Sequence, residues 1–184
     1  AAGVEKFPVE ARKRFLQKDE AKRLFAAMEK ENTPQFIKDV IYLGLLTGRK
    51  KGELLSMRWA DLNFEEGVWT LKKQVGKKEV RIPLLSEAKE ILQRRKESID
   101  SDYVFPGSGK RKHKVDLRRG WNELMKQAEI EDLVFNDLRR TVGVWQAYSG
   151  SSAETISQSL ANVSPKSARI YLELAEENPL KTSL

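Results

Sequence analysis

The chain has 184 residues, enough for one domain with a substantial core and too few for two comfortable ones. It contains no cysteine and a single histidine, His113, which excludes disulfides, thiolate chemistry, cysteine-ligated zinc and any histidine-rich metal site. No apolar run approaches the ~20 residues that span a bilayer, and no signal-peptide pattern opens the sequence.

The positive charge of the chain favours a polyanionic partner. The formal net charge is +7 and the sequence pI is about 9.5. A charge of this size is ordinary for a soluble domain, but its clustering favours nucleic acid, because basic runs neutralise phosphates and release counterions. The clusters are RKK (49–51), KK (72–73), KK (77–78), KRKHK (110–114) and RR (139–140). They fall mostly at the ends of predicted elements and in loops, which disfavours a basic membrane-surface helix.

Helices dominate the first part of the chain. Residues 1–14 have no sustained apolar period and are typical of a linker or interdomain arm. Helical spacing of apolar residues begins at Gln17 and runs to Met28. A second helix is predicted between Thr33, as N-cap before Pro34, and Gly48, where it should stop. It is apolar on most sides and should be central, and a short helix should follow over 50–57.

The middle of the chain changes character, because β-forming residues separated by turn signals occupy residues 61–83. This pattern predicts a small antiparallel sheet of two or three strands. Apolar residues at helical spacing then resume. The predicted helices span 86–98, 114–129, 137–149, 153–161 and 165–177. The fold class is therefore mostly α with a small antiparallel β-sheet (α+β).

Three segments resemble the catalytic domain of the tyrosine recombinases, the phage-integrase family. LLTGRKKGELLSMRWADLNF (45–64) is similar to the family box T-G-x-R-x-x-E-x-x-x-L-x-W-x-D. VFNDLRRT (134–141) is similar to H-x-L-R-x-T, and SQSLANVSPKSARIYLEL (157–174) is similar to L-G-H-x(8)-Y. RIPL (81–84) and DYVFPGSG (102–109) also look like family features. The resemblance rests on the order and spacing of these segments over residues 14–175.

The resemblance implies that Tyr171 attacks a DNA phosphodiester and forms a 3′-phosphotyrosine bond, with no metal and no cofactor. It also implies that Arg139 is one of two catalytic arginines, since a guanidinium can grip two oxygens of the charged transition state. For an isolated residue, a partly buried structural tyrosine or a surface arginine is the better interpretation. The matched spacing favours catalysis. Arg140 remains an accessory DNA contact or ordinary surface charge.

A general acid must protonate the departing 5′-oxygen, and the resemblance implies a lysine on the β-hairpin. The candidates are Lys73, which we choose, and Lys72, and either can instead serve as a backbone contact. Further DNA contacts are predicted at basic positions of the clusters. With Lys72 and Arg140, they are Arg49, Lys110, Arg111 and Lys112.

The family pattern is broken at three catalytic positions. Lys50 stands where the first box has its arginine, and Arg49 lies one place early, where one helical step of ~100° would turn it away. Asn136 replaces the histidine of the second box, and Asn162 replaces the histidine or tryptophan of the third. Asparagine can bond a phosphate oxygen but cannot shuttle protons near neutral pH. Ala161 replaces the usual glycine.

Two functions of different classes follow, besides a weaker reading as an RNA-binding domain. The first is a site-specific recombinase or integrase, weakened by these changes, that acts on double-stranded DNA as a homo-oligomer. The second is an inactive relative that binds DNA as an architectural or regulatory protein. The resemblance further implies that residues 15–184 form the catalytic domain, that an N-terminal core-binding domain is missing, and that the protein works in a bacterial cytoplasm.

Overall fold

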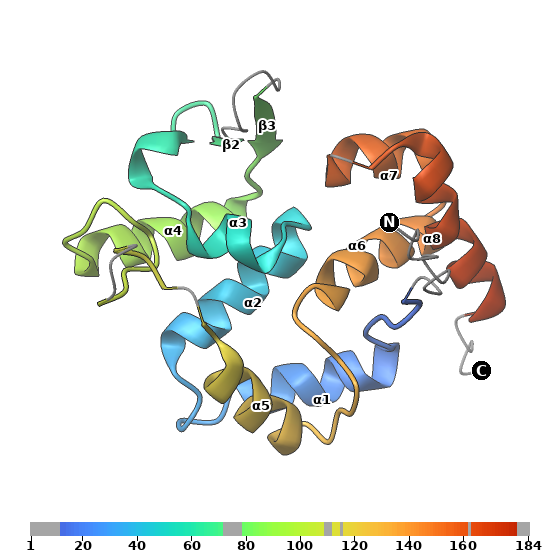
Figure 1. Ribbon diagram of the computed structural model, residues 1–184, viewed down its shortest axis with the longest axis horizontal. Coiled ribbons are helices and arrows are strands. Elements are labelled where there is room, and N and C mark those ends of the chain that lie inside the picture. The colour runs from blue at the N-terminus through green and yellow to red at the C-terminus, as the bar shows by residue number, and fades with distance from the viewer. Residues whose placement is uncertain (1–11, 72–78, 109–111, 115, 162, 180–184) are drawn as a thin grey trace, which may run out of the picture.

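A largely buried helix, α2 (Gln35–Thr47), lies at the centre of the fold, with α3, α4 and α6 packed around it (Figure 1). The computed structural model describes residues 12–71, 79–108, 112–114, 116–161 and 163–179. The side chains of Ile37, Val40, Ile41 and Leu43 on α2 are fully enclosed. The prediction of a central apolar helix is therefore confirmed.

The prediction for the end of α2 at Gly48 is confirmed, but the prediction of Thr33 as its N-cap is wrong. The hydroxyl of Thr33 donates to the carbonyl of Ala27, 3.2 Å away, so Pro34 takes the N-cap position instead. At the other end, Gly48 adopts a left-handed conformation with φ of 63°. A Cβ at this position would lie 2.6 Å from Cδ2 of Leu160. Both the backbone angle and the close approach therefore require glycine.

The other elements from α1 to α4 follow the predicted order along the chain. Their bounds are α1 (Lys18–Met28), α3 (Lys51–Leu55), the 3-10 turn η1 (Trp59–Asp61), β1 (Leu62–Asn63), β2 (Val68–Leu71), β3 (Val80–Pro83) and α4 (Ser86–Ser98). The strands form one antiparallel sheet in the order β1-β2-β3. Trp69 in the middle strand pairs with Leu62 and Ile82 and is 1% exposed, which anchors the sheet on the core.

The helix α5 (Arg118–Gln127) begins four residues later than predicted. The preceding residues are held in an extended pairing: His113 bridges Pro106, and the Lys114 N–H donates to the Phe105 carbonyl at 2.7 Å. A carboxylate oxygen of Asp116 then accepts the Arg118 N–H at 2.8 Å, which favours a start at this point. The basic run at 112–114 thus lies outside the helix.

The last three helices, α6 (Asp137–Tyr148), α7 (Ala153–Leu160) and α8 (Pro165–Glu177), pack against one another on one side of the molecule (Figure 1). They enclose a second, smaller core that includes Phe15, Val144, Ile156 and Leu174. Helix α6 belongs to both cores, because Leu138 near its start lies in the main one. The start of α6 thus packs in the main core, and its later turns contribute to the second one.

Residues 12–16, which the sequence assigns partly to an arm, are bound to the first turn of α6. The Arg12 guanidinium donates to both carboxylate oxygens of Asp137 at 2.9–3.0 Å, and the Leu16 N–H donates to the Thr141 hydroxyl at 2.9 Å. Asp137 also accepts the Val134 N–H. Burial alone raises the pKa of Asp137, but Arg12 and the Val134 N–H outweigh it and hold that pKa below its usual value.

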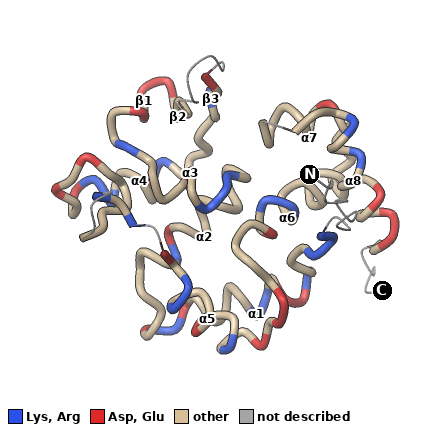
Figure 2. Tube along the Cα trace, viewed as in Figure 1, with Lys and Arg blue, Asp and Glu red and all other residues tan. Residues whose placement is uncertain are grey.

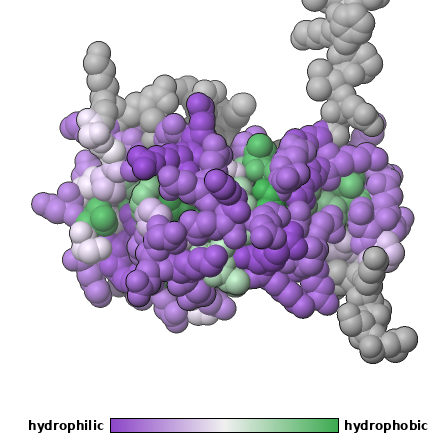
Figure 3. Space-filling model, turned by 90° about the horizontal axis from the view of Figure 1, so that it is seen from below, coloured by the Kyte–Doolittle hydropathy of each residue, from purple (hydrophilic) through white to green (hydrophobic). Residues whose placement is uncertain are grey.

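The surface seen from below is mostly hydrophilic, and hydrophobic residues appear on it only as separate patches (Figure 3). Among the described helices, none is both long and apolar enough to cross a membrane.

We expect Asp137→Asn to lower the free energy of unfolding at pH 7 by about 2 kcal/mol, because a buried, multiply bonded carboxylate loses its charge. The folded-state pKa is depressed, so the stabilisation is present above the ordinary pKa of ~3.9 and is lost as pH falls through the folded value. Urea unfolding at pH 7 and at acid pH measures this effect. Acidification should lower the free energy of unfolding less in the variant than in the wild type. The matched control Asp102→Asn, at an exposed ion pair, should change stability by less than about 0.5 kcal/mol.

Candidate functional site

Arg139, on the first turn of α6, is buried and points at the ends of two other helices. Its Nη1 donates to the carbonyls of Gly48 and Leu160, both at 2.7 Å, and its Nη2 donates to the carbonyl of Ala161 at 2.6 Å. A guanidinium has five N–H donors. The Nε–H and one Nη2–H therefore make no bond to any residue that the structure describes, and they remain available to another acceptor.

Tyr171, on α8, lies against α6 one helical turn beyond Arg139. A Cβ at Gly143 would be 2.7 Å from Cγ of the tyrosine ring, so only glycine leaves room for this contact. The ring is 9% exposed, and its hydroxyl makes no hydrogen bond within the described part of the chain. Burial lowers the pKa of Arg139, while the charges of Tyr171 and Glu53 act in the opposite direction. The phenol and the guanidinium thus share one site.

Arg49 is a second guanidinium at this site, and it is 1% exposed. Its Nε donates to the Thr47 carbonyl at 2.9 Å and its Nη2 to the Ser159 carbonyl at 2.7 Å, while its Nη1 is buried without a hydrogen-bond partner in the described structure. Burial, and then repulsion from Arg139, lowers the pKa of Arg49 to about 10 against the opposing effect of Glu53. Arg49 therefore remains charged at neutral pH, next to another cation.

The positions of Arg49 and Lys50 are the reverse of the sequence expectation. Lys50 is exposed, and its backbone N–H donates to a carboxylate oxygen of Glu53 at 2.9 Å. The argument from one helical step fails because the connection between α2 and α3 is not helical: Gly48 is left-handed and Lys50 is extended. Arg49, predicted as a DNA contact, is enclosed beside Arg139.

Two like charges can stand together here because helix carbonyls surround them. The carbonyls come from the C-terminal ends of α2 and α7, where the helix dipole is negative. Figure 2 shows the basic segment between α2 and α3 facing the basic start of α6. Ala161, which closes α7, has φ of 47° and ψ of 153°, a conformation that is strained for any residue but glycine. The backbone is thus held in a costly shape where it binds Arg139.

Among the other predicted site residues, one lies at the same junction, one pairs with internal groups, one is exposed, and the rest lie outside the described residues. Asn136 is exposed at the start of α6, and its Oδ1 accepts the Lys51 N–H at 3.1 Å, so it lies at the same junction as Arg49. Arg140, predicted as a DNA contact, is instead an internal partner of Asp137 and of the Arg14 carbonyl, both at 2.8 Å. Lys112 is exposed with φ of 58°. Lys72, Lys73, Lys110, Arg111 and Asn162 lie outside the described residues.

Sequence reasoning missed two features of the site. Gly143, which admits the tyrosine ring, shows in the sequence only as a glycine four residues after Arg139 within an apolar helix. Glu53, whose charge acts on both guanidiniums, was matched to the first family box without a role. The carbonyls at the end of α7 could not be predicted from the sequence, because every residue type has a backbone carbonyl.

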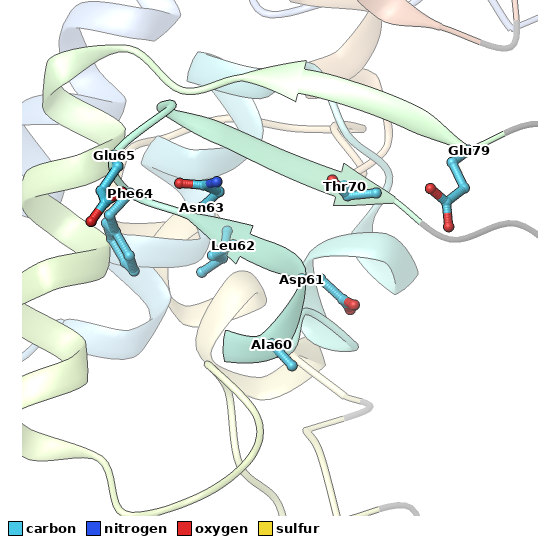
Figure 4. A pocket seen from close by; sticks show the side chains of 8 residues that line it. All are labelled: Ala60, Asp61, Leu62, Asn63, Phe64, Glu65, Thr70 and Glu79. Carbon is cyan, nitrogen blue, oxygen red and sulfur yellow. The ribbon is translucent and has the colours of Figure 1, made fainter.

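A hollow of about 560 Å³ beside the sheet is a different kind of surface (Figure 4). Asp61, Glu65 and Glu79 contribute carboxylates to its lining, together with Asn63 and Thr70. The described lining of this hollow therefore presents carboxylate and amide or hydroxyl groups and no cation. Within the described residues, no group of histidine, aspartate and glutamate side chains is arranged to hold a metal ion.

The model of the Phage integrase family matches residues 14–178, and the chain belongs to this family. Tyrosine recombinase XerA of Pyrococcus furiosus is 29% identical over 173 residues, which cover 89% of this chain and 58% of the relative. Prophage integrase IntF of Escherichia coli K12 is 29% identical over 133 residues, which cover 70% of this chain and 28% of the relative. The chain thus spans less than two thirds of the length of these relatives.

Solved structures show the same fold. The crystal structure of XerA recombinase superposes with a TM-score of 0.71 at 22% identity, over 97% of this chain and 68% of that one. The post-cleavage complex of XerH site-specific recombinase with palindromic difH substrate gives a TM-score of 0.72 at 17% identity, over 89% and 50%. The expected fold, mostly α with a small antiparallel sheet as in tyrosine recombinase catalytic domains, is confirmed.

Replacing Arg49 by methionine tests whether this arginine serves stability or function. We expect Arg49→Met to raise the free energy of unfolding by about 1 kcal/mol, because it removes a desolvated charge, its repulsion from Arg139 and an unbonded buried donor. Urea unfolding measures the change. A loss of stability would show instead that the bonds to Thr47 and Ser159 dominate and that Arg49 is a structural residue.

Proposed function

We propose that this chain is the catalytic domain of a site-specific recombinase that cuts and rejoins double-stranded DNA through Tyr171. The observation that carries the proposal is the meeting of one phenol and two guanidiniums in a single buried site, with N–H donors of both cations left unbonded by the described residues. The family membership and the solved relatives that are bound to DNA support the same substrate.

The chemistry needs no external energy source. The Tyr171 oxygen attacks the phosphorus, the bond from phosphorus to the 5′-oxygen breaks, and a 3′-phosphotyrosine and a free 5′-hydroxyl result. The tyrosine loses a proton and the departing oxygen gains one. A 5′-hydroxyl that attacks the phosphotyrosine reverses these steps and releases the tyrosine, so the enzyme ends the cycle unchanged.

The cations serve the transition state, in which negative charge grows on the non-bridging oxygens. The free Nε–H and Nη2–H of Arg139 form a fork that suits two such oxygens. Arg49 supplies a second positive charge in a low-dielectric setting, where its effect is larger than in water. Asn136, at the edge of the same junction, has an amide group whose N–H can bond a phosphate oxygen.

Proton transfer remains assigned to the hairpin, with Lys73 as the general acid and Lys72 as a backbone contact. Asn162 is proposed as a phosphate contact in place of the usual proton-shuttling residue. The exposed Lys50 and Lys112, with Lys110 and Arg111, contribute positive charge toward the DNA backbone. On this proposal the protein works as a homo-oligomer on a specific site.

A binding protein without catalysis is the second candidate. It is favoured by the exposed position of Lys50, the residue at the arginine position of the family pattern, and by asparagine at both proton-shuttling positions. Such a protein would use the same positive surface but form no covalent bond.

A nicked suicide substrate separates the two candidates. The wild-type chain should form a protein–DNA adduct that survives denaturing gel electrophoresis, and Tyr171→Phe should form none, because it lacks the attacking oxygen. Binding of the duplex by the variant, measured by fluorescence anisotropy, should stay within about threefold of wild type. Binding without any adduct in the wild type would establish the second candidate.

The same substrate identifies the second cation. Arg49→Met should lower the rate of adduct formation by about 10²–10³, the cost of losing one preorganised transition-state donor. Lys50→Met, the matched control on the neighbouring residue, should lower it by less than about tenfold through weaker DNA binding. The opposite ranking would assign the role to Lys50.

The close contact between the Tyr171 ring and Gly143 provides an independent test. Gly143→Ala should reduce adduct formation at least about tenfold, because the new Cβ displaces the ring from its contact with α6. Gly52→Ala is the matched control, since a Cβ there meets nothing within 4 Å. Equal rates in the two variants would contradict the proposed position of Tyr171 during cleavage.

A further inference from the structure

An apolar groove of about 570 Å³ runs between α1, α2, α4 and α6. Six hydrophobic side chains line it: Phe25, Tyr42, Leu45, Leu46, Ile91 and Trp145. All six are half-buried and pack against the main core, so the groove is an open extension of that core. Tyr42 and Phe25 form its stacked aromatic part, with ring centroids 6.0 Å apart and planes within 4°.

The rim of the groove is negative, although the protein as a whole is strongly positive. Glu87 and Glu90 of α4 line it, are exposed, and form no ion pair with any described cation. The third acid, Asp39, is buried and pairs with both Arg94 and Arg95, and Arg94 also lines the groove, so the negative charge of the rim comes from Glu87 and Glu90. A backbone N–H and the Ser86 hydroxyl lower the pKa of Glu87, which is therefore ionised at neutral pH. Such a rim repels the DNA backbone and attracts basic groups.

Two polar groups of the lining are free to bind an occupant. The Tyr42 hydroxyl and the indole N–H of Trp145 make no hydrogen bond to any residue in the described part of the chain. Burial, and then the charge of Glu29, raises the pKa of Tyr42, so its hydroxyl stays a donor. Tyrosine and tryptophan with an apolar body and a free polar group are the residues that dominate binding at protein interfaces.

The groove is separate from the candidate active site. Trp145 follows Gly143 by two residues on α6, which places it about 200° around the helix axis from the contact with Tyr171. An occupant of the groove therefore does not block the tyrosine or the two guanidiniums.

We propose that this groove binds a short amphipathic helix of a partner protein, with leucine-like side chains on the aromatic surface and lysine or arginine beside Glu87 and Glu90. The half-buried hydrophobic floor supplies the affinity, and the acidic rim selects a basic partner over an acidic one. A basic side chain can also lie over the rings of Phe25 and Tyr42, where a cation is stabilised.

The test uses a fluorescein-labelled synthetic peptide of about 16 residues, with leucines at the i, i+4, i+7 spacing and flanking lysines. A second peptide carries glutamates in place of the lysines. Fluorescence anisotropy with the full chain should show binding of the lysine peptide and at least about tenfold weaker binding of the glutamate peptide. Glu87→Lys/Glu90→Lys should weaken the lysine peptide about tenfold and strengthen the glutamate peptide.

Glu97→Lys is the matched control, because it reverses an exposed charge on the same helix outside the groove. It should leave both affinities within about twofold. Equal binding of the two peptides, no effect of the double substitution, or displacement of the lysine peptide by a DNA duplex would overturn the proposal. So would self-association of the chain that the double substitution abolishes, because the occupant would then be a second copy. Adduct formation on the suicide substrate is measured separately and does not depend on these outcomes.

Discussion

The structure depends on holding two guanidiniums together inside the protein with few opposite charges to neutralise them. Arg49 and Arg139 repel each other, and both are desolvated. What offsets this cost is a set of five backbone carbonyls at the ends of α2 and α7, assisted by Glu53. The left-handed Gly48 and the strained Ala161 each present one of these carbonyls to Arg139. Two unusual backbone conformations thus occur at residues that bind the same guanidinium.

Such an arrangement is a poor way to stabilise a fold and a good way to bind an anion. Two buried cations and an unbonded donor destabilise the folded protein. A negatively charged oxygen bound between them would offset this cost. Gly143 also destabilises the fold locally, because glycine has a low helix propensity, but only glycine leaves space for the Tyr171 ring. These features concentrate at one junction of α2, α6, α7 and α8, while the rest of the molecule follows ordinary packing rules. The proposed site and the costly features of the fold therefore lie at the same place.

The sequence predicted the helices and the sheet well, because their periodicity and turn residues are local signals. Its errors arose where a distant contact decided the conformation. The Thr33 hydroxyl donates to the Ala27 carbonyl and does not cap α2. The pairing of Lys114 with Phe105 keeps this segment extended, so α5 begins later than predicted. The exchange of Arg49 and Lys50 has a different, local origin, because helical geometry was assumed across a connection that Gly48 interrupts. Local patterns could not show which side chain is enclosed by the end of α7.

The docking of residues 12–16 on α6 has a consequence for measurement. The Leu16 amide proton is buried in a hydrogen bond to Thr141, whose own hydroxyl donates to the Asp137 carbonyl two residues before Arg139. Its exchange with deuterated solvent must await separation of this segment from the helix. The isotope uptake of this one amide thus reports how often residues 12–16 separate from the turn that carries Arg139.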